Sequence, residues 1–114
     1  MTDPGAVPFD IPCSTTFELP GLTVERHVGL CFGLIVRSVG FAKGFSGSIK
    51  SLRAGEVTEY TDVVEQARRH ALERLVAHAQ QLGGNAVVGI RFDSSDVGNG
   101  LSEIVAYGTA VVAS

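Results

Sequence analysis

Five side chains of this sequence could bind a transition metal ion through a thiol or an imidazole: Cys13, His27, Cys31, His70 and His78. None of them forms the closely spaced pairs that are typical of structural zinc sites. His70 and His78 are expected on one helix, about 12 Å apart along its axis, which is too far to share an ion. Ligand number and spacing therefore fall short within a single chain, and exposed histidines with a buried thiol are the alternative.

His27 and Cys31 are the candidate metal ligands that we retain. A strand is expected over residues 23–36 and places both side chains on one face, about 13 Å apart. In a ring-shaped assembly, symmetry copies could bring identical ligands together if either residue lined a channel or a subunit interface. The cofactor to consider is therefore a transition metal ion held between subunits.

Arg91, Glu103 and Tyr107 form a second candidate group. Glu103 and Tyr107 lie four residues apart on one face of an expected strand, and Arg91 lies on the neighbouring strand. They could bind a ligand or another subunit, or they could be a cross-strand ion pair beside a packed tyrosine. Because no signature of an activated nucleophile surrounds any serine, threonine or cysteine, we expect no enzymatic activity.

Gly83 and Gly84 raise the question of a phosphate-binding loop. In such loops the glycines follow a strand and open a helix, so that the helix N-terminus points at the phosphate. Here they follow a periodic apolar segment and precede a strand of β-branched residues. The order predicts a helix C-terminus, where a residue with positive φ ends the last turn.

The apolar spacing predicts a β-α-β-β order. The long helix should begin with Thr61 as its N-cap, and Asn99-Gly100 should form a hairpin turn within 94–100. Phe41 to Leu52 keeps the spacing of a short amphipathic helix. The expected strands are residues 23–36, 86–93 and 101–113, and the expected long helix is 61–82.

This order gives an α+β fold with one long helix on a small antiparallel or mixed sheet. One helix covers only one face of three strands. We expect the other face to hold Cys31, Ile35 and Val87, and to be buried by further copies of the chain in a closed ring, because monomers rarely expose so large an apolar surface.

Length and composition define the class of protein. The chain has 114 residues, 45% hydrophobic residues and a net charge of −3, which predicts one globular domain with no affinity for nucleic acid. No apolar run is long enough to cross a membrane. Two cysteines without a CxxC pattern favour reduced thiols in the cytoplasm. We expect a flexible arm over residues 1–12 and a single domain over 13–114.

Three stretches carry a resemblance to a known family. STTFELPG (14–21), EYTDVVEQARRHALERLVAHAQQLGGNAVVGIRFD (59–93) and SEIVAYGTAVV (102–112) resemble the YbjQ family, and the similarity runs from about Cys13 to the C-terminus. The resemblance implies dodecin-like subunits that assemble as homopentamers, no established activity and a heavy-metal-binding label. It favours an oligomeric structural or binding module; the alternative is a metal or small-ligand binder with sites between subunits.

Overall fold

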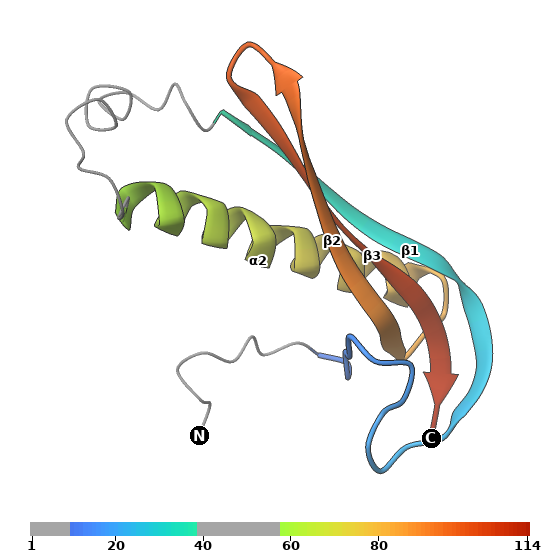
Figure 1. The fold of residues 1–114 in the computed structure, drawn as a ribbon. Coiled ribbons are helices and arrows are strands. Elements are labelled where there is room, and N and C mark those ends of the chain that lie inside the picture. The colour runs from blue at the N-terminus through green and yellow to red at the C-terminus, as the bar shows by residue number, and fades with distance from the viewer. Residues whose placement is uncertain (1–9, 39–57) are drawn as a thin grey trace.

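The computed structural model describes residues 10–38 and 58–114, and of 58–60 the backbone alone. The elements are β1 (Val24–Ser38), α2 (Thr58–Gln81), β2 (Ala86–Gly98) and β3 (Leu101–Ala113), which confirms the β-α-β-β order (Figure 1). The strands form one antiparallel sheet in the order β1-β3-β2. The α+β fold is thus confirmed. The short helix expected over 41–52 and residues 1–9 of the expected arm lie outside the described residues.

The two glycine-containing junctions have the predicted structures. Gly83 has φ of 94°, and the amide of Gly84 donates to the carbonyl of Ala79 at 2.9 Å, which closes α2 with a Schellman motif. Asn99 and Gly100 have φ of 55° and 74°, as the tight turn of a two-residue hairpin requires. The glycine pair is therefore a helix end rather than a phosphate loop.

Two boundaries differ from the expected ones. The helix begins at Thr58, so Thr61 lies inside it and is not its N-cap. Strand β2 continues through the polar residues up to Gly98 instead of ending at Asp93. The tip of the β2–β3 hairpin projects away from the helix in Figure 1, and Asp93 to Asn99 are all exposed. Polar residues form a strand here because β3 supplies the hydrogen-bonding partners.

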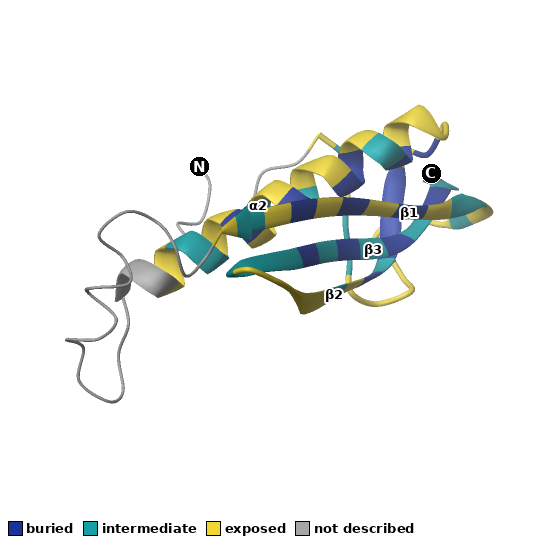
Figure 2. Ribbon diagram, turned by 90° about the horizontal axis from the view of Figure 1, so that it is seen from above, coloured by how far each residue is buried: buried dark blue, intermediate teal, exposed yellow. Residues whose placement is uncertain are grey.

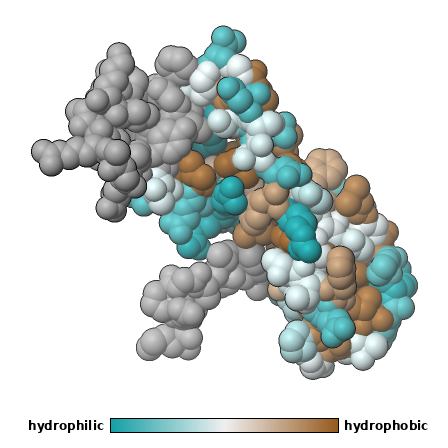
Figure 3. Space-filling view, viewed as in Figure 1, coloured by the Kyte–Doolittle hydropathy of each residue, from teal (hydrophilic) through white to brown (hydrophobic). Residues whose placement is uncertain are grey.

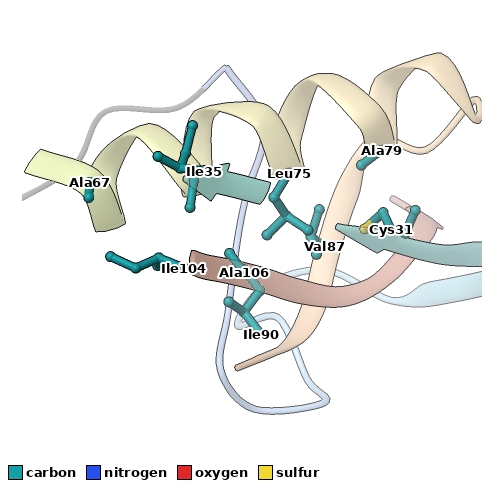
Figure 4. Close-up of a cluster of buried hydrophobic side chains, with 11 residues drawn as sticks. Cys31, Ile35, Ala67, Leu75, Ala79, Val87, Ile90, Ile104 and Ala106 are labelled. Carbon is teal, nitrogen blue, oxygen red and sulfur yellow. The ribbon is translucent and has the colours of Figure 1, made fainter. Parts of the chain in front are cut away.

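The helix packs mainly on β1 and β3, on the face that carries Cys31 and Ile35. Figure 4 shows both side chains in the buried cluster, Ile35 next to the helix and Cys31 near Ala79 and Val87. A Cβ added at Gly33 would lie 2.2 Å from the carbonyl oxygen of Ala71, so the backbones of β1 and α2 are almost in contact. Small residues at the crossing allow this approach.

This arrangement corrects the predicted assignment of the two faces. We expected Cys31, Ile35 and Val87 to be left for other subunits, but all three are buried in the cluster under α2. The side chains left outside are those of the alternate β1 positions, and Figure 2 shows β1 striped in buried and exposed residues. On β1 the helix therefore covers the face of Cys31, Gly33 and Ile35, and leaves exposed the face that carries a large apolar side chain at every position from Leu30 to Val36.

A glycine bulge in β2 changes the predicted alternation of that strand. The register shifts between Val88 and Arg91, and Gly89 has φ of 65°. As a result Val87 packs with Ile90 under the helix, whereas Val88 joins a second cluster with Leu19 on the opposite face. Simple alternation over the expected strand 86–93 would place Ala86, Val88, Ile90 and Phe92 on one face, and this expectation is wrong.

The segment before β1 covers one end of the face opposite the helix. Val87 donates its amide hydrogen to the carbonyl of Pro12 at 3.0 Å, and Gly89 donates to that of Thr16 at 2.9 Å. Leu19 is buried there against Ala86 and Val111. This cover ends near Gly89, so the remainder of the face has no described element over it.

Candidate functional site

The uncovered part of the sheet is a face with an apolar half and a polar half. On β1, Leu30, Phe32, Leu34 and Val36 are 69%, 49%, 40% and 53% exposed. Across the sheet, Phe32 pairs with Tyr107, which pairs with Arg91. This open face, as we call it, is apolar along β1 and polar along β2. In the view of Figure 3, hydrophobic and hydrophilic side chains lie side by side over the described residues.

The polar half of the open face brings two of the predicted candidates together. The Tyr107 hydroxyl is hydrogen-bonded to the Asp93 carboxylate, and this bond and the negative charge of Asp93 raise the pKa of Tyr107, against a lowering effect of Arg91. Arg91 donates to the carbonyls of Thr15 and Ile90, each at 2.8 Å. The hydrogen-bonded partner of Tyr107 is therefore Asp93, a residue that the sequence analysis did not select.

Glu103 lies further along the same face and does not join this group. It pairs with Ser95 on β2 and with Val36 on β1. The only ion pair among the described residues joins Arg69 to Glu65 within the helix, at 3.5 Å. The ion pair that the sequence suggested between Arg91 and Glu103 is therefore not formed.

A groove follows the outer edge of β1 where α2 passes it. Its volume is about 500 Å³, and Phe32 and Leu34 of the open face form its apolar wall. Arg74, Ala77, His78 and Gln81 line it from the helix. The groove is therefore continuous with the apolar half of the open face and carries basic side chains along its other side.

Both helix histidines accept hydrogen bonds from β1. The Phe32 amide donates to Nδ1 of His78 at 3.0 Å, and the two rings meet edge to face with centroids 5.1 Å apart. A guanidinium nitrogen of Arg37 lies 3.1 Å from Nδ1 of His70 and can only donate to it. In neutral imidazoles these contacts place the remaining proton on Nε2, so each ring presents an N–H donor on its other side.

This tautomer is the opposite of the one that a metal site uses. A histidine that binds a metal through Nε2 normally keeps its proton on Nδ1 and donates it to an acceptor. In this chain both Nδ1 atoms face donors. Neither His70 nor His78 is arranged to bind a metal through Nε2.

The structure separates the two retained metal candidates. The register shift between His27 and Gly29 places His27 opposite Val111 and Cys31 opposite Gly108. Because these β3 partners are three residues apart, His27 and Cys31 point to opposite faces, and the expected common face is wrong. Cys31 is buried, with its thiol 3.6 Å from the carbonyl of Gly108, whereas His27 is exposed.

The thiols are also poorly prepared for a metal. Burial raises the pKa of Cys31, and burial followed by the charge of Cys31 raises that of Cys13 from 9.0 to about 11. Metal ligation needs the thiolate. In the part of the chain that the structure describes, no three His, Cys, Asp or Glu side chains converge as a metal-binding group.

The groove residues are what the sequence analysis missed. His70, Arg74 and His78 recur every four residues, which places them along one side of a helix. The sequence alone indicates exposed histidines and does not show which element lies beside this row of side chains. The spacing was the available signal, but only the structure shows that β1 lies beside it.

A family model described as "Putative heavy-metal-binding" matches residues 11–114, which is nearly the whole chain. The chain belongs to the YbjQ family. Relatives of this YbjQ-family chain carry the name UPF0145. One from Bradyrhizobium sp. (strain ORS 278) is 51% identical over 98 residues, covering 86% of this chain and 88% of its own. Another, from Burkholderia thailandensis, is 41% identical over 113 residues, covering 99% and 96%.

A solved structure supports the fold independently. It is a protein of unknown function from Pediococcus pentosaceus, of the DUF74 family, with a TM-score of 0.58 and 17% identity. The similarity covers 90% of this chain and 96% of the other. At that identity the similarity concerns the fold alone. Among the described residues no helix is long and apolar enough to cross a membrane.

Proposed function

We propose that this YbjQ-family protein is a non-enzymatic module that works as a closed homo-oligomer, a ring of five copies in the cytoplasm. Its role is to scaffold a partner or bind a ligand on the surface that the ring creates. The number five comes from the resemblance to the family, and a cytoplasmic location fits the two free cysteines.

The open face is the observation that carries this proposal. Four large apolar side chains follow one another on β1, and each is at least 40% exposed. Burying a side chain of this size stabilises an interface by about 1.5–3 kcal/mol. A second copy is the partner that is always present, and closed homo-oligomers are the commonest way to cover such a surface.

A pair of neighbouring substitutions tests the proposal. Leu34→Asp places a charge on the open face and should give folded subunits of 11.9 kDa instead of a ring. Ile35→Asp places the same charge under the helix and should give unfolded or insoluble protein, since an unpaired buried charge costs several kcal/mol. Native mass spectrometry and circular dichroism measure the two effects.

The mass of the unsubstituted parent protein decides how these results are interpreted. A mass that is a multiple of 11.9 kDa establishes the oligomer. A parent that stays monomeric at micromolar concentration would contradict the proposal. A Leu34→Asp variant with the parent's mass would instead remove the open face from the interface.

Metal binding is the second candidate, because the family description names it. The donor set of one chain does not fit, so the site would need several copies. His27 is exposed, and no described residue hydrogen-bonds to its ring, unlike His70 and His78. Elemental analysis of protein purified without chelator should then show metal in the parent and none in His27→Ala. A His78→Ala variant is the control and should keep the metal.

A further inference from the structure

Among its described lining residues, the α2–β1 groove presents two basic side chains and no carboxylate to match them. Arg74 and the Nε2–H of His78 lie along it, and His70 with Arg37 extends the same row at one end. None of the described residues that line the groove is acidic. A ligand for this row must supply carboxylates or carbonyl oxygens, together with apolar atoms for Phe32 and Leu34.

The free part of β2 has the complementary chemistry. The segment Asp93–Gly98, which we call the acidic arm, carries Asp93 and Asp96 and is exposed throughout. From Phe92 to Ser114 the chain has no lysine, arginine or histidine. The segment before β1 pairs with β2 only as far as Ile90, so no described strand pairs with the outer edge of the acidic arm.

The strand order prevents the acidic arm from reaching the groove of its own chain. In the order β1-β3-β2, the groove follows the outer edge of β1 and the acidic arm forms part of the outer edge of β2. Strand β3 lies between them. Only another copy can bring the two surfaces together, and because they are different surfaces the contact must be head to tail.

We propose that the acidic arm of each copy docks into the α2–β1 groove of the next copy. This inference rests on the proposed homo-oligomer and names its interface. The lengths agree: His70 to Gln81 spans about 16 Å of helix, and Asp93 to Gly98 spans about 17 Å of strand. A head-to-tail contact of this kind closes into a ring when its rotation allows, which a two-fold contact does not do.

The docked arm satisfies three features that are otherwise unexplained. Its carboxylates and carbonyls accept hydrogen bonds from Arg74 and His78 in a charge-assisted pairing. Its backbone covers Phe32 and Leu34. Docking also brings the outer edge of β2 in one copy to the outer edge of β1 in the next. Each edge then covers the unpaired backbone groups of the other, which would otherwise favour aggregation.

Charge reversal tests the interface. Arg74→Glu should repel the acidic arm and weaken association by at least about tenfold, measured by native mass spectrometry across a dilution series. The double variant Arg74→Glu with Asp93→Arg should regain assembly, because each copy again carries opposite charges on the two surfaces. Arg26→Glu makes the same charge change on β1 outside the groove and should assemble like the parent.

The outcomes separate this inference from the proposed function. An oligomeric parent with an equally oligomeric Arg74→Glu variant would overturn the interface and leave the ring intact. A monomeric parent would overturn both. Should Arg74→Glu fail to fold by circular dichroism, Asp93→Arg alone decides, because Asp93 is exposed and its replacement should dissociate the ring without loss of helix.

Discussion

The two faces of the sheet are built from different kinds of side chain. Under α2 the contact positions are Gly33, Ala71, Ala79 and Ala106, small residues that bring helix and sheet backbones together. On the open face the neighbouring β1 positions are leucine, phenylalanine and valine, all exposed. The closest approach of helix and sheet uses small residues, with larger ones such as Leu75 and Ile35 packed beside them, whereas four large apolar side chains of β1 stay exposed on the other face. The face that appears less hydrophobic in the sequence is therefore the folding core.

The most direct test of the close contact between helix and sheet is to enlarge Gly33, the smallest residue under the helix. Gly33→Ala places a methyl group within 2.2 Å of the Ala71 carbonyl and 2.4 Å of the Leu75 amide, both of them backbone atoms. The helix must move away from β1, and the free energy of unfolding should fall by about 3 kcal/mol, the upper end of the usual cost of overpacking, because both obstructing atoms belong to the backbone. Urea denaturation followed by circular dichroism measures it. Unchanged stability would mean that α2 does not approach β1 this closely.

A matched substitution on the other side of the sheet should cost less. Gly89→Ala also introduces a close contact, 2.7 Å, but with the ring of Phe17, which is largely exposed and can rotate away. The remaining cost comes from φ of 65°, which costs an alanine about 1–2 kcal/mol. The same urea experiment should place Gly89→Ala between Gly33→Ala and the parent. A loss equal to that of Gly33→Ala would show that the segment over this end of the sheet is as rigid as the helix.

The two thiols differ in burial, and their rates of alkylation should differ accordingly. In a Cys31→Ser variant, Cys13 should still react with iodoacetamide at pH 8 more slowly than in the urea-unfolded chain, because burial, the larger cause of its raised pKa, remains and leaves little thiolate. Its rate should keep rising above pH 9, where the rate of the unfolded chain levels off. Cys31 in a Cys13→Ser variant should react only as fast as the protein unfolds.

The sign of the accompanying stability change follows from the same shift in pKa. The fold favours the neutral Cys13 thiol, so this contribution is complete below pH 9 and is lost as the pH rises from 9 to about 11. A Cys13→Ser variant should lack this part of the alkaline destabilisation. An equal loss in parent and variant would assign it to other groups.

Local features were predictable from the sequence because they depend on neighbours in the chain. Gly83 ends a helix and Asn99-Gly100 turns a hairpin because few residues adopt positive φ. Strand β3 has the bounds expected for it, residues 101–113. The candidate site was harder to predict from the sequence. The sequence pointed to Arg91 and Tyr107 but not to Asp93, whose carboxylate is hydrogen-bonded to Tyr107 on the neighbouring strand.

The wrong predictions about β1 and β2 have one cause. Which side chains share a face of the sheet depends on the strand register, and the register is set by the tertiary structure. A register shift at Val28 moved His27 away from Cys31, and the bulge at Gly89 moved Val88 away from Ile90. Alternation counts residues and cannot detect where one is skipped. The stripe of His70, Arg74 and His78 was visible in the sequence, but its partner strand was not.

The sequence by itself determined the class of fold, the order of its elements and the positions where they turn, because periodicity and backbone sterics act over a few residues. Only the tertiary structure decided which apolar face the helix covers. That choice depends on how closely two backbones approach, and Gly33 allows an approach that no larger residue would. The same choice left the open face and the α2–β1 groove outside, and these are the surfaces that we propose for the contacts of this YbjQ-family chain with its own copies.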